Sequence, residues 1–72
     1  MPEDVVAEIV ATVLEISVEA GQQVAVGDTL VLLESMKMEI PVVAEDPGTI
    51  GEVRVTVGEV IQAGHTIATY QA

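Results

Sequence analysis

The stretch VLEISVEAGQQVAVGDTLVLLE, residues 13–34, has a second copy in the chain, IGEVRVTVGEVIQAGHTIATYQ, at residues 50–71. The two copies align without a gap at a shift of 37 positions, and five aligned positions are identical. Two of these identities pair glycines: Gly21 with Gly58 and Gly27 with Gly64. Because glycine adopts backbone conformations that other residues avoid, matching glycines indicate matching turns. The chain is therefore expected to consist of two copies of one structural unit.

The repeat resolves an ambiguity at the start of the chain. Residues 5–14, VVAEIVATVL, have a spacing of apolar residues that fits a helix or a strand. Their counterpart, PGTIGEVRVTV, contains a proline and two glycines and then alternates valines with polar residues, which is typical of a strand. Both copies are therefore predicted to be strands, with Leu14, Ile16 and Val18 on one side. We expect about eight short strands and no helix.

Length and composition limit the class of protein. Seventy-two residues form one domain, 1–72. Without cysteine the chain has no disulfide or thiolate site, which is compatible with a cytoplasmic location, and no signal peptide or membrane-spanning segment is recognisable. A net charge of −10 argues against nucleic acid and against anionic membranes. The acidity provides solubility or steers the chain toward a basic partner. Tyr70 is the only aromatic residue, so valine, isoleucine and leucine must form the core.

The segment LLESMKMEIP, residues 32–41, contains the only lysine of the chain, Lys37, between Met36 and Met38. It lies between two strand-like runs, TLVLLE and MEIPVV, so Lys37 is predicted near the tip of a hairpin. A shift of 37 in either direction carries this lysine off the chain, which leaves it without a counterpart. A two-fold arrangement of the copies would place the lysine hairpin at one end of the molecule and both termini at the other.

A lysine at such a tip has limited chemistry of its own. Its amine is almost entirely protonated near neutral pH, so it is a poor nucleophile without help. The amine would suffice if a partner enzyme supplied an activated acyl group and a base.

The residues around the lysine match a known family. ESMKME, residues 34–39, resembles the E-A-M-K-M-E attachment motif of the biotinyl domains of biotin-dependent carboxylases. The glycine turns on both sides also match, and the resemblance covers residues 8–71. It implies the biotinyl/lipoyl fold, an all-β flattened barrel-sandwich hybrid of two four-stranded antiparallel sheets related by a pseudo-two-fold axis.

The resemblance also implies a function as a biotin carboxyl carrier. A biotin protein ligase would present biotinyl-adenylate, and Lys37 Nζ would attack it to form an amide. Biotin carboxylase would load the tethered biotin, and a carboxyltransferase would pass the carboxyl group to an acceptor. The chain itself would contain no catalytic residue and no metal site, and would position the cofactor on a mobile arm.

Several assignments have alternatives. A lipoyl-type carrier of a 2-oxo-acid dehydrogenase-like complex uses the same hairpin, usually with D-K-A, and an unmodified domain docking by its acidic face is a third possibility. Met36 and Met38 are either recognition elements for the carboxylase steps or strand-end core residues. Glu34 and Glu39 either contact a ligase or are solvated strand residues. His65 is predicted to be a turn residue and Arg54 a surface ion-pair partner.

Two positions depart from the family pattern. Ser35 stands where alanine is usual, and we expect ligase recognition to tolerate its hydroxyl. Ala11 stands where glycine is usual, to judge from Gly48, which lies 37 residues later. If that position needed a positive φ, alanine would destabilise the fold by about 1 kcal/mol.

Overall fold

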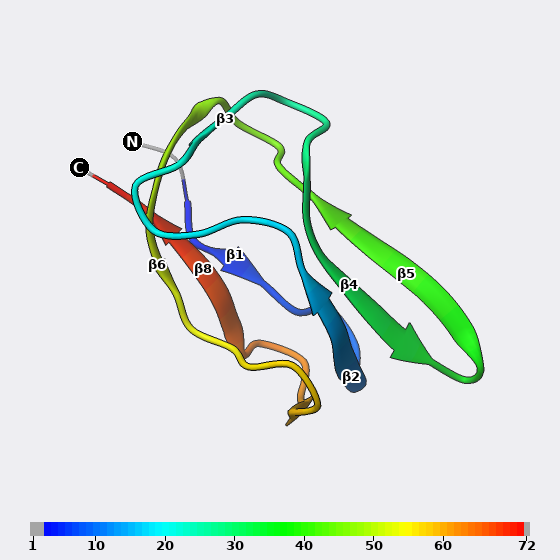
Figure 1. Cartoon of the computed structure of the whole chain (residues 1–72). Coiled ribbons are helices and arrows are strands. Elements are labelled where there is room, and N and C mark those ends of the chain that lie inside the picture. The colour runs from blue at the N-terminus through cyan, green and yellow to red at the C-terminus, as the bar shows by residue number, and fades with distance from the viewer. Residues whose placement is uncertain (1–2, 72) are drawn as a thin grey trace.

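The structure is a computed structural model that describes residues 3–71 of the chain (Figure 1). Within these residues it contains eight strands and no helix: β1 (Val5–Val6), β2 (Ala11–Ile16), β3 (Gln23–Val24), β4 (Thr29–Ser35), β5 (Met38–Val43), β6 (Gly48–Val53), β7 (Val60–Ile61) and β8 (Thr66–Tyr70). They form two four-stranded antiparallel sheets, ordered β1-β8-β6-β3 and β5-β4-β2-β7. The predicted all-β fold is confirmed. No helix in the described residues is long and apolar enough to cross a membrane.

The internal repeat of the sequence is an internal symmetry of the fold. Strand β6 begins and ends 37 residues after β2, and β7 begins and ends 37 residues after β3. The sheet orders become identical when β1, β8, β6 and β3 are exchanged for β5, β4, β2 and β7. The hydrogen bonds repeat too, because Gly21 N–H donates to Ile50 O at 2.8 Å and Gly58 N–H donates to Val13 O at 2.8 Å. The two copies therefore share one structure.

The matched glycines are required by the turns that they form. Gly21 and Gly58 have φ values of 90° and 91°, and Gly27 and Gly64 have 92° and 89°. Residues with a Cβ rarely adopt this conformation, whereas glycine adopts it readily. The glycine identities therefore preserve two turns in each copy of the repeat.

The predicted alternation along β2 is only partly correct. Ala11 and Val13 are buried, but the next inward residues are Ile16 and Val18, and Leu14 lies outside this set. The pairing with β4 shifts register between Val13 and Glu15, as expected for a β-bulge. A bulge adds one residue to one strand and so reverses the direction in which the later side chains of that strand point. The prediction that grouped Leu14 with Ile16 and Val18 is therefore wrong.

The condition for backbone strain at Ala11, a positive φ, is not met. Ala11 is not among the described residues with a positive φ, and Gly48 is not either. The Ala11 side chain is 4% exposed and belongs to the core. This position therefore contributes burial, and alanine causes no backbone penalty there.

The core consists of aliphatic side chains supplied by both copies. Its largest fully buried members are Leu30, Ile50, Ile61, Ile67, Val13 and Val31. Leu30 and Ile67 correspond under the 37-residue shift, and so do Val13 and Ile50. No described polar or charged residue is buried. The fold is therefore stabilised by burial of apolar surface rather than by internal polar contacts.

The overall shape separates the lysine hairpin from the ends of the chain. The molecule measures 33 × 18 × 17 Å along its principal axes. The β4–β5 hairpin projects at one end, and the first and last described residues lie toward the other (Figure 1). The arrangement predicted from the unmatched lysine is confirmed.

Candidate functional site

The β4–β5 hairpin carries the candidate site. Its rungs pair Leu33 with Ile40, Glu34 with Glu39 and Ser35 with Met38, leaving a two-residue loop. That loop is formed by Met36 and Lys37, so the lysine lies at the tip, as predicted. Strands β4 and β5 are among the longest of the fold, and β4 is supported on its other side by β2. The lysine backbone is therefore held on a rigid support while its side chain is free to extend.

The loop at the tip has an unusual conformation for its residues. Met36 has φ 54° and Lys37 has φ 64°, and these two are the only described non-glycine residues with a positive φ. Two successive positive φ values are those of a type I′ hairpin turn, which strongly prefers Asn-Gly, Asp-Gly or Gly-Gly. A side chain with a Cβ is disfavoured there by roughly 1–2 kcal/mol per residue. The chain therefore keeps methionine and lysine at the tip at the expense of stability.

Replacing Met36 by asparagine and Lys37 by glycine should consequently stabilise the fold. We expect the free energy of unfolding to rise by about 1–3 kcal/mol, because the double variant relieves unfavourable backbone conformations. Urea unfolding followed by circular dichroism measures this change. The control is Met38→Asn, which lies in β5 outside the turn and should give no such gain. An unchanged or lower stability of the double variant would show that the turn is not strained.

The two methionines beside the lysine are exposed. Met36 is 91% exposed and Met38 is 66% exposed. Neither side chain belongs to the core, so the alternative in which they are strand-end core residues is ruled out. An exposed pair of flexible, polarizable side chains offers apolar contact to whatever approaches the lysine.

Glu34 and Glu39 lie directly opposite each other on neighbouring strands, one rung below Ser35 and Met38. Both glutamates are exposed, and residues paired in this way point to the same face of the sheet. Like charges directly opposite each other are destabilising. Ser35 is half-buried and faces the other side, because side chains alternate along a strand. Glu34 and Glu39 are thus a second place where the hairpin gives up stability.

The tip presents an amine without internal assistance. No carboxylate in residues 3–71 lies within 4.0 Å of the Lys37 ammonium. The side chain is exposed, and no described hydrogen bond constrains it. The geometry therefore suits covalent modification by a partner that brings its own base. An acyl group attached to this exposed amine would project from the tip.

Comparison with known proteins agrees with this geometry. The family described as "Biotin-requiring enzyme" matches residues 1–70. The chain belongs to this biotin/lipoyl family. It is 69% identical over 68 residues to a biotinylated protein TB7.3 homolog of Mycolicibacterium smegmatis, and 63% identical over 68 residues to one of Mycobacterium leprae. Each alignment covers 94% of this chain and 96% of the relative.

Solved structures of other proteins have the same fold as this chain. A domain of a single-chain, multi-domain long-chain acyl-CoA carboxylase matches with a TM-score of 0.84 and 33% identity, covering 92% of this chain and 7% of that one. The lipoyl domain of the 2-oxoglutarate dehydrogenase complex from Azotobacter vinelandii matches with a TM-score of 0.84 and 22% identity, covering 99% of this chain and 98% of that one. The second likeness concerns the fold alone. The predicted membership of the family is confirmed.

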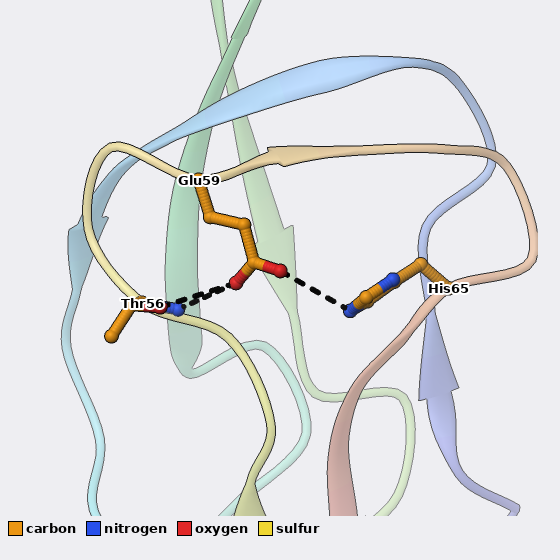
Figure 2. A network of polar contacts seen from close by, with 3 residues as sticks. All are labelled: Thr56, Glu59 and His65. Carbon is orange, nitrogen blue, oxygen red and sulfur yellow. Dashed lines mark hydrogen bonds and ion pairs between the residues drawn. The ribbon is translucent and has the colours of Figure 1, made fainter.

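His65 takes part in a small polar network at a turn, shown in Figure 2. Thr56 donates to Glu59 Oε1 from its backbone N–H at 3.0 Å and from its hydroxyl at 3.2 Å. His65 Nε2 lies 3.9 Å from Glu59 Oε2. Gln22, the counterpart of Glu59, accepts from Glu19 N–H in the first copy, so this contact is a shared turn feature. The prediction of a turn residue at position 65 is confirmed.

Arg54 forms a surface ion pair, and the described residues contain no metal site. Arg54 Nη1 lies 4.0 Å from Glu52 Oε1, and both side chains are mostly exposed, so the pair contributes little. This agrees with the predicted surface ion pair. Within residues 3–71 no group of three histidine, aspartate or glutamate side chains could hold a metal ion.

Two features of the site were not predicted from the sequence. The position of Lys37 at a tip was predicted but the turn type was not, although only two residues separate Ser35 from Met38. The direct cross-strand pairing of Glu34 with Glu39 is the second feature. A two-residue loop at Met36 and Lys37 fixes the register of the hairpin, so that Ser35 pairs with Met38 and Glu34 with Glu39.

Proposed function

We propose that this chain is a biotin carboxyl carrier, a single biotinyl domain spanning residues 1–72 that carries biotin on Lys37. The observation that carries the proposal is the one lysine of the chain, exposed at a hairpin tip between two exposed methionines. The site fits a covalent acyl cofactor, because an unobstructed primary amine is the group that an amide linkage requires. The mycobacterial relatives are named biotinylated proteins, which supports biotin as that cofactor.

The attachment requires a biotin protein ligase that supplies the activated carboxyl group as a mixed anhydride with adenylate. Lys37 Nζ attacks the carbonyl carbon, so that a C–N bond forms and the C–O bond to AMP breaks. The proton of the amine leaves to a base of the ligase, since no described carboxylate of the chain lies within 4.0 Å of the ammonium. AMP is the leaving group, and an amide remains.

Once bound, biotin would accept a carboxyl group and give it up again. The chain contributes position. Lys37 lies in the two-residue loop of the β4–β5 hairpin. That hairpin projects at the end of the molecule opposite the first and last described residues (Figure 1), so the arm can enter one active site after another. Linkage also raises the effective concentration of the cofactor at both sites. Biotin carboxylase and a carboxyltransferase are the proposed partners, and the likeness to an acyl-CoA carboxylase domain supports them.

The residues around Lys37 would serve recognition. Met36 and Met38 provide apolar contact at the tip, and Glu34 and Glu39 present two carboxylates on one face of the hairpin. These carboxylates suit a basic surface of the ligase or of a carboxylase component. Ser35 contributes a small side chain beside the tip, which leaves room for close approach.

A parallel comparison of the two cofactors tests the proposal. The unmodified chain is incubated with a biotin ligase, biotin and ATP, and separately with a lipoate ligase, lipoate and ATP, and its intact mass is recorded. We expect complete conversion to a single biotin adduct and no lipoate adduct, because both neighbours of the lysine are methionines. A lipoate adduct alone would favour the lipoyl-type carrier, and no adduct from either ligase would favour an unmodified docking domain.

A further inference from the structure

The two sheets are left open along one side, where strand β1 ends the first sheet and β5 ends the second. Paired strands lie about 4.8 Å apart. No Cα of β1 lies within 8 Å of a Cα of β5, so these two edges do not pair. A groove of about 460 Å³ occupies the space between them. We call it the edge groove; it is lined by residues 3–9, Leu33, residues 40–43, Glu45, Asp46 and Tyr70.

The edge groove lies on the pseudo-two-fold axis of the fold. Its central residues, Val5 and Val6 of β1, correspond to Val42 and Val43 of β5 under the 37-residue shift. Leu33 and Tyr70 correspond in the same way. The centre is therefore apolar on both sides. Val6 and Val43 are 44% and 41% exposed, which leaves apolar surface open to solvent in the groove.

The charges of the edge groove break this symmetry. Glu3, Asp4, Glu45 and Asp46 also line the groove. Glu3 and Asp4 directly precede β1, and the Tyr70 hydroxyl at the end of β8 donates to Asp46 O at 2.8 Å, so these carboxylates belong to the part near the chain ends. In the part near the lysine hairpin, Glu8 is the only carboxylate among the described lining residues. Under the 37-residue shift Ile9 corresponds to Asp46 and Ile40 corresponds to Glu3, so isoleucines replace two of the acidic residues there. No lysine, arginine or histidine is among the described residues that line it. The groove is thus acidic at one end and apolar at the other.

Both edges also have backbone groups available for pairing. Ala44 N–H donates to Asp28 O and Ala44 O accepts from Gly27 N–H, so residue 44 bonds toward β4. Because bonding direction alternates along a strand, the N–H and C=O of Val43 lie on the free edge. Ala7 bonds to His65 and Gly64 in the same way, which places the corresponding groups of Val6 on the free edge of β1. A strand that entered the groove could therefore form ladder hydrogen bonds.

We propose that the edge groove binds an extended segment of a partner protein. Aliphatic side chains of that segment fill the apolar centre, and lysine or arginine residues at one of its ends lie against Glu3, Asp4, Glu45 and Asp46. The charge distribution fixes the direction in which the segment lies, and the valine edges supply backbone pairing. The apolar end adjoins Ile40, two residues from Met38, so a bound partner would reach the lysine hairpin. The inference does not depend on modification of Lys37.

The experiment uses the 72-residue chain labelled with ¹⁵N and a synthetic peptide of two lysines followed by alternating valine and threonine. A second peptide with two glutamates in place of the lysines is the charge control. We expect amide shifts confined mainly to residues 3–9 and 40–46, binding that weakens as salt is added, and no binding of the glutamate peptide. The Lys37→Arg chain should bind the lysine peptide equally well, which separates this inference from the proposed function.

Matched variants test whether the groove itself is responsible. The double variant Glu45→Lys with Asp46→Lys should lower the affinity for the lysine peptide about tenfold or more. The control Glu15→Lys with Glu19→Lys changes the net charge by the same amount outside the groove and should lower that affinity much less. Val43→Ser should weaken binding, and the exposed Val26→Ser should not. The proposal would be overturned by amide chemical-shift changes spread over the whole acidic surface. It would also be overturned if the groove variants and their controls lost equal affinity for the peptide.

Discussion

Replacing Lys37 by arginine is expected to abolish biotin incorporation by a biotin protein ligase. Arginine keeps the positive charge and most of the length of the side chain, but its guanidinium has no free amine that becomes a nucleophile. No other lysine can substitute, because the chain has only one. The fold should be unaffected, since the side chain at the tip is exposed and makes no described hydrogen bond. Streptavidin blotting after co-expression with the ligase measures the loss.

A swap of the two basic residues provides the matched control. Lys37→Arg combined with Arg54→Lys keeps one lysine, one arginine and the net charge, and moves the amine to an exposed position just after β6. We expect no incorporation in the swapped chain, because recognition requires the lysine at the β4–β5 tip. Incorporation into the swapped chain would mean that the ligase accepts any exposed lysine, and the hairpin would lose its assigned role.

Replacing Met36 and Met38 by serine should separate loading from carboxyl transfer. Ligation is expected to stay within a few-fold of the wild-type rate. Carboxyl transfer between the partner enzymes should fall by roughly thirtyfold, corresponding to loss of about 2 kcal/mol of apolar contact at a small interface. Stability should change little, because the two side chains are 91% and 66% exposed. The rate of biotin ligation and the rate of acceptor carboxylation are measured on the same preparation.

The control for the methionine pair is Val26→Ser with Val57→Ser. These valines are 64% and 63% exposed and belong to other loops, so they remove a comparable apolar surface away from the tip. The control should leave both rates unchanged. Equal carboxyl transfer by the methionine variant and the wild-type chain would refute the recognition role of Met36 and Met38.

The lysine hairpin shows how a functional site can oppose stability. Met36 and Lys37 adopt positive φ values that favour glycine or asparagine, and Glu34 faces Glu39 across the strands. At each of these four positions another residue would give a more stable hairpin. Departures from such rules are expected at functional sites, where a rigid scaffold offsets the penalty. The aliphatic core of the two repeats supplies that scaffold.

Much of the fold was predictable because the repeat constrains two segments at once. Gly21 and Gly58 were ambiguous singly, but together they indicated equivalent turns, and both have φ near 90°. The bulge after Val13 was not predictable, because alternation in sequence does not reveal where an extra residue enters a strand. The second copy has a register shift at the equivalent place, between Ile50 and Glu52, where Gly51 corresponds to Leu14. The two copies therefore have different residues at the bulge. A Cβ on Gly51 would lie 3.2 Å from the backbone carbonyl carbon of Tyr70, and only the assembled sheet reveals that constraint.

The position of Lys37 was predictable for a different reason. It followed from the absence of a counterpart in the repeat and from the strand-like runs on either side, and the structure places it at a tip. The edge groove was not predictable, because its residues come from the start, the middle and the end of the chain. Only the pairing of β1 with β8 and of β5 with β4 leaves those two edges facing the same opening.

The most direct test of the central claim is to locate the modification by fragment mass spectrometry of the ligase-treated wild-type chain. The chain offers two primary amines, the side chain of Lys37 and the terminal amine. We predict a single biotinyl group in every modified molecule, attached to Lys37 and absent from the terminal fragment. A biotinyl group on the terminal amine, or a chain that stays unmodified under conditions that load an established carrier domain, would contradict the account.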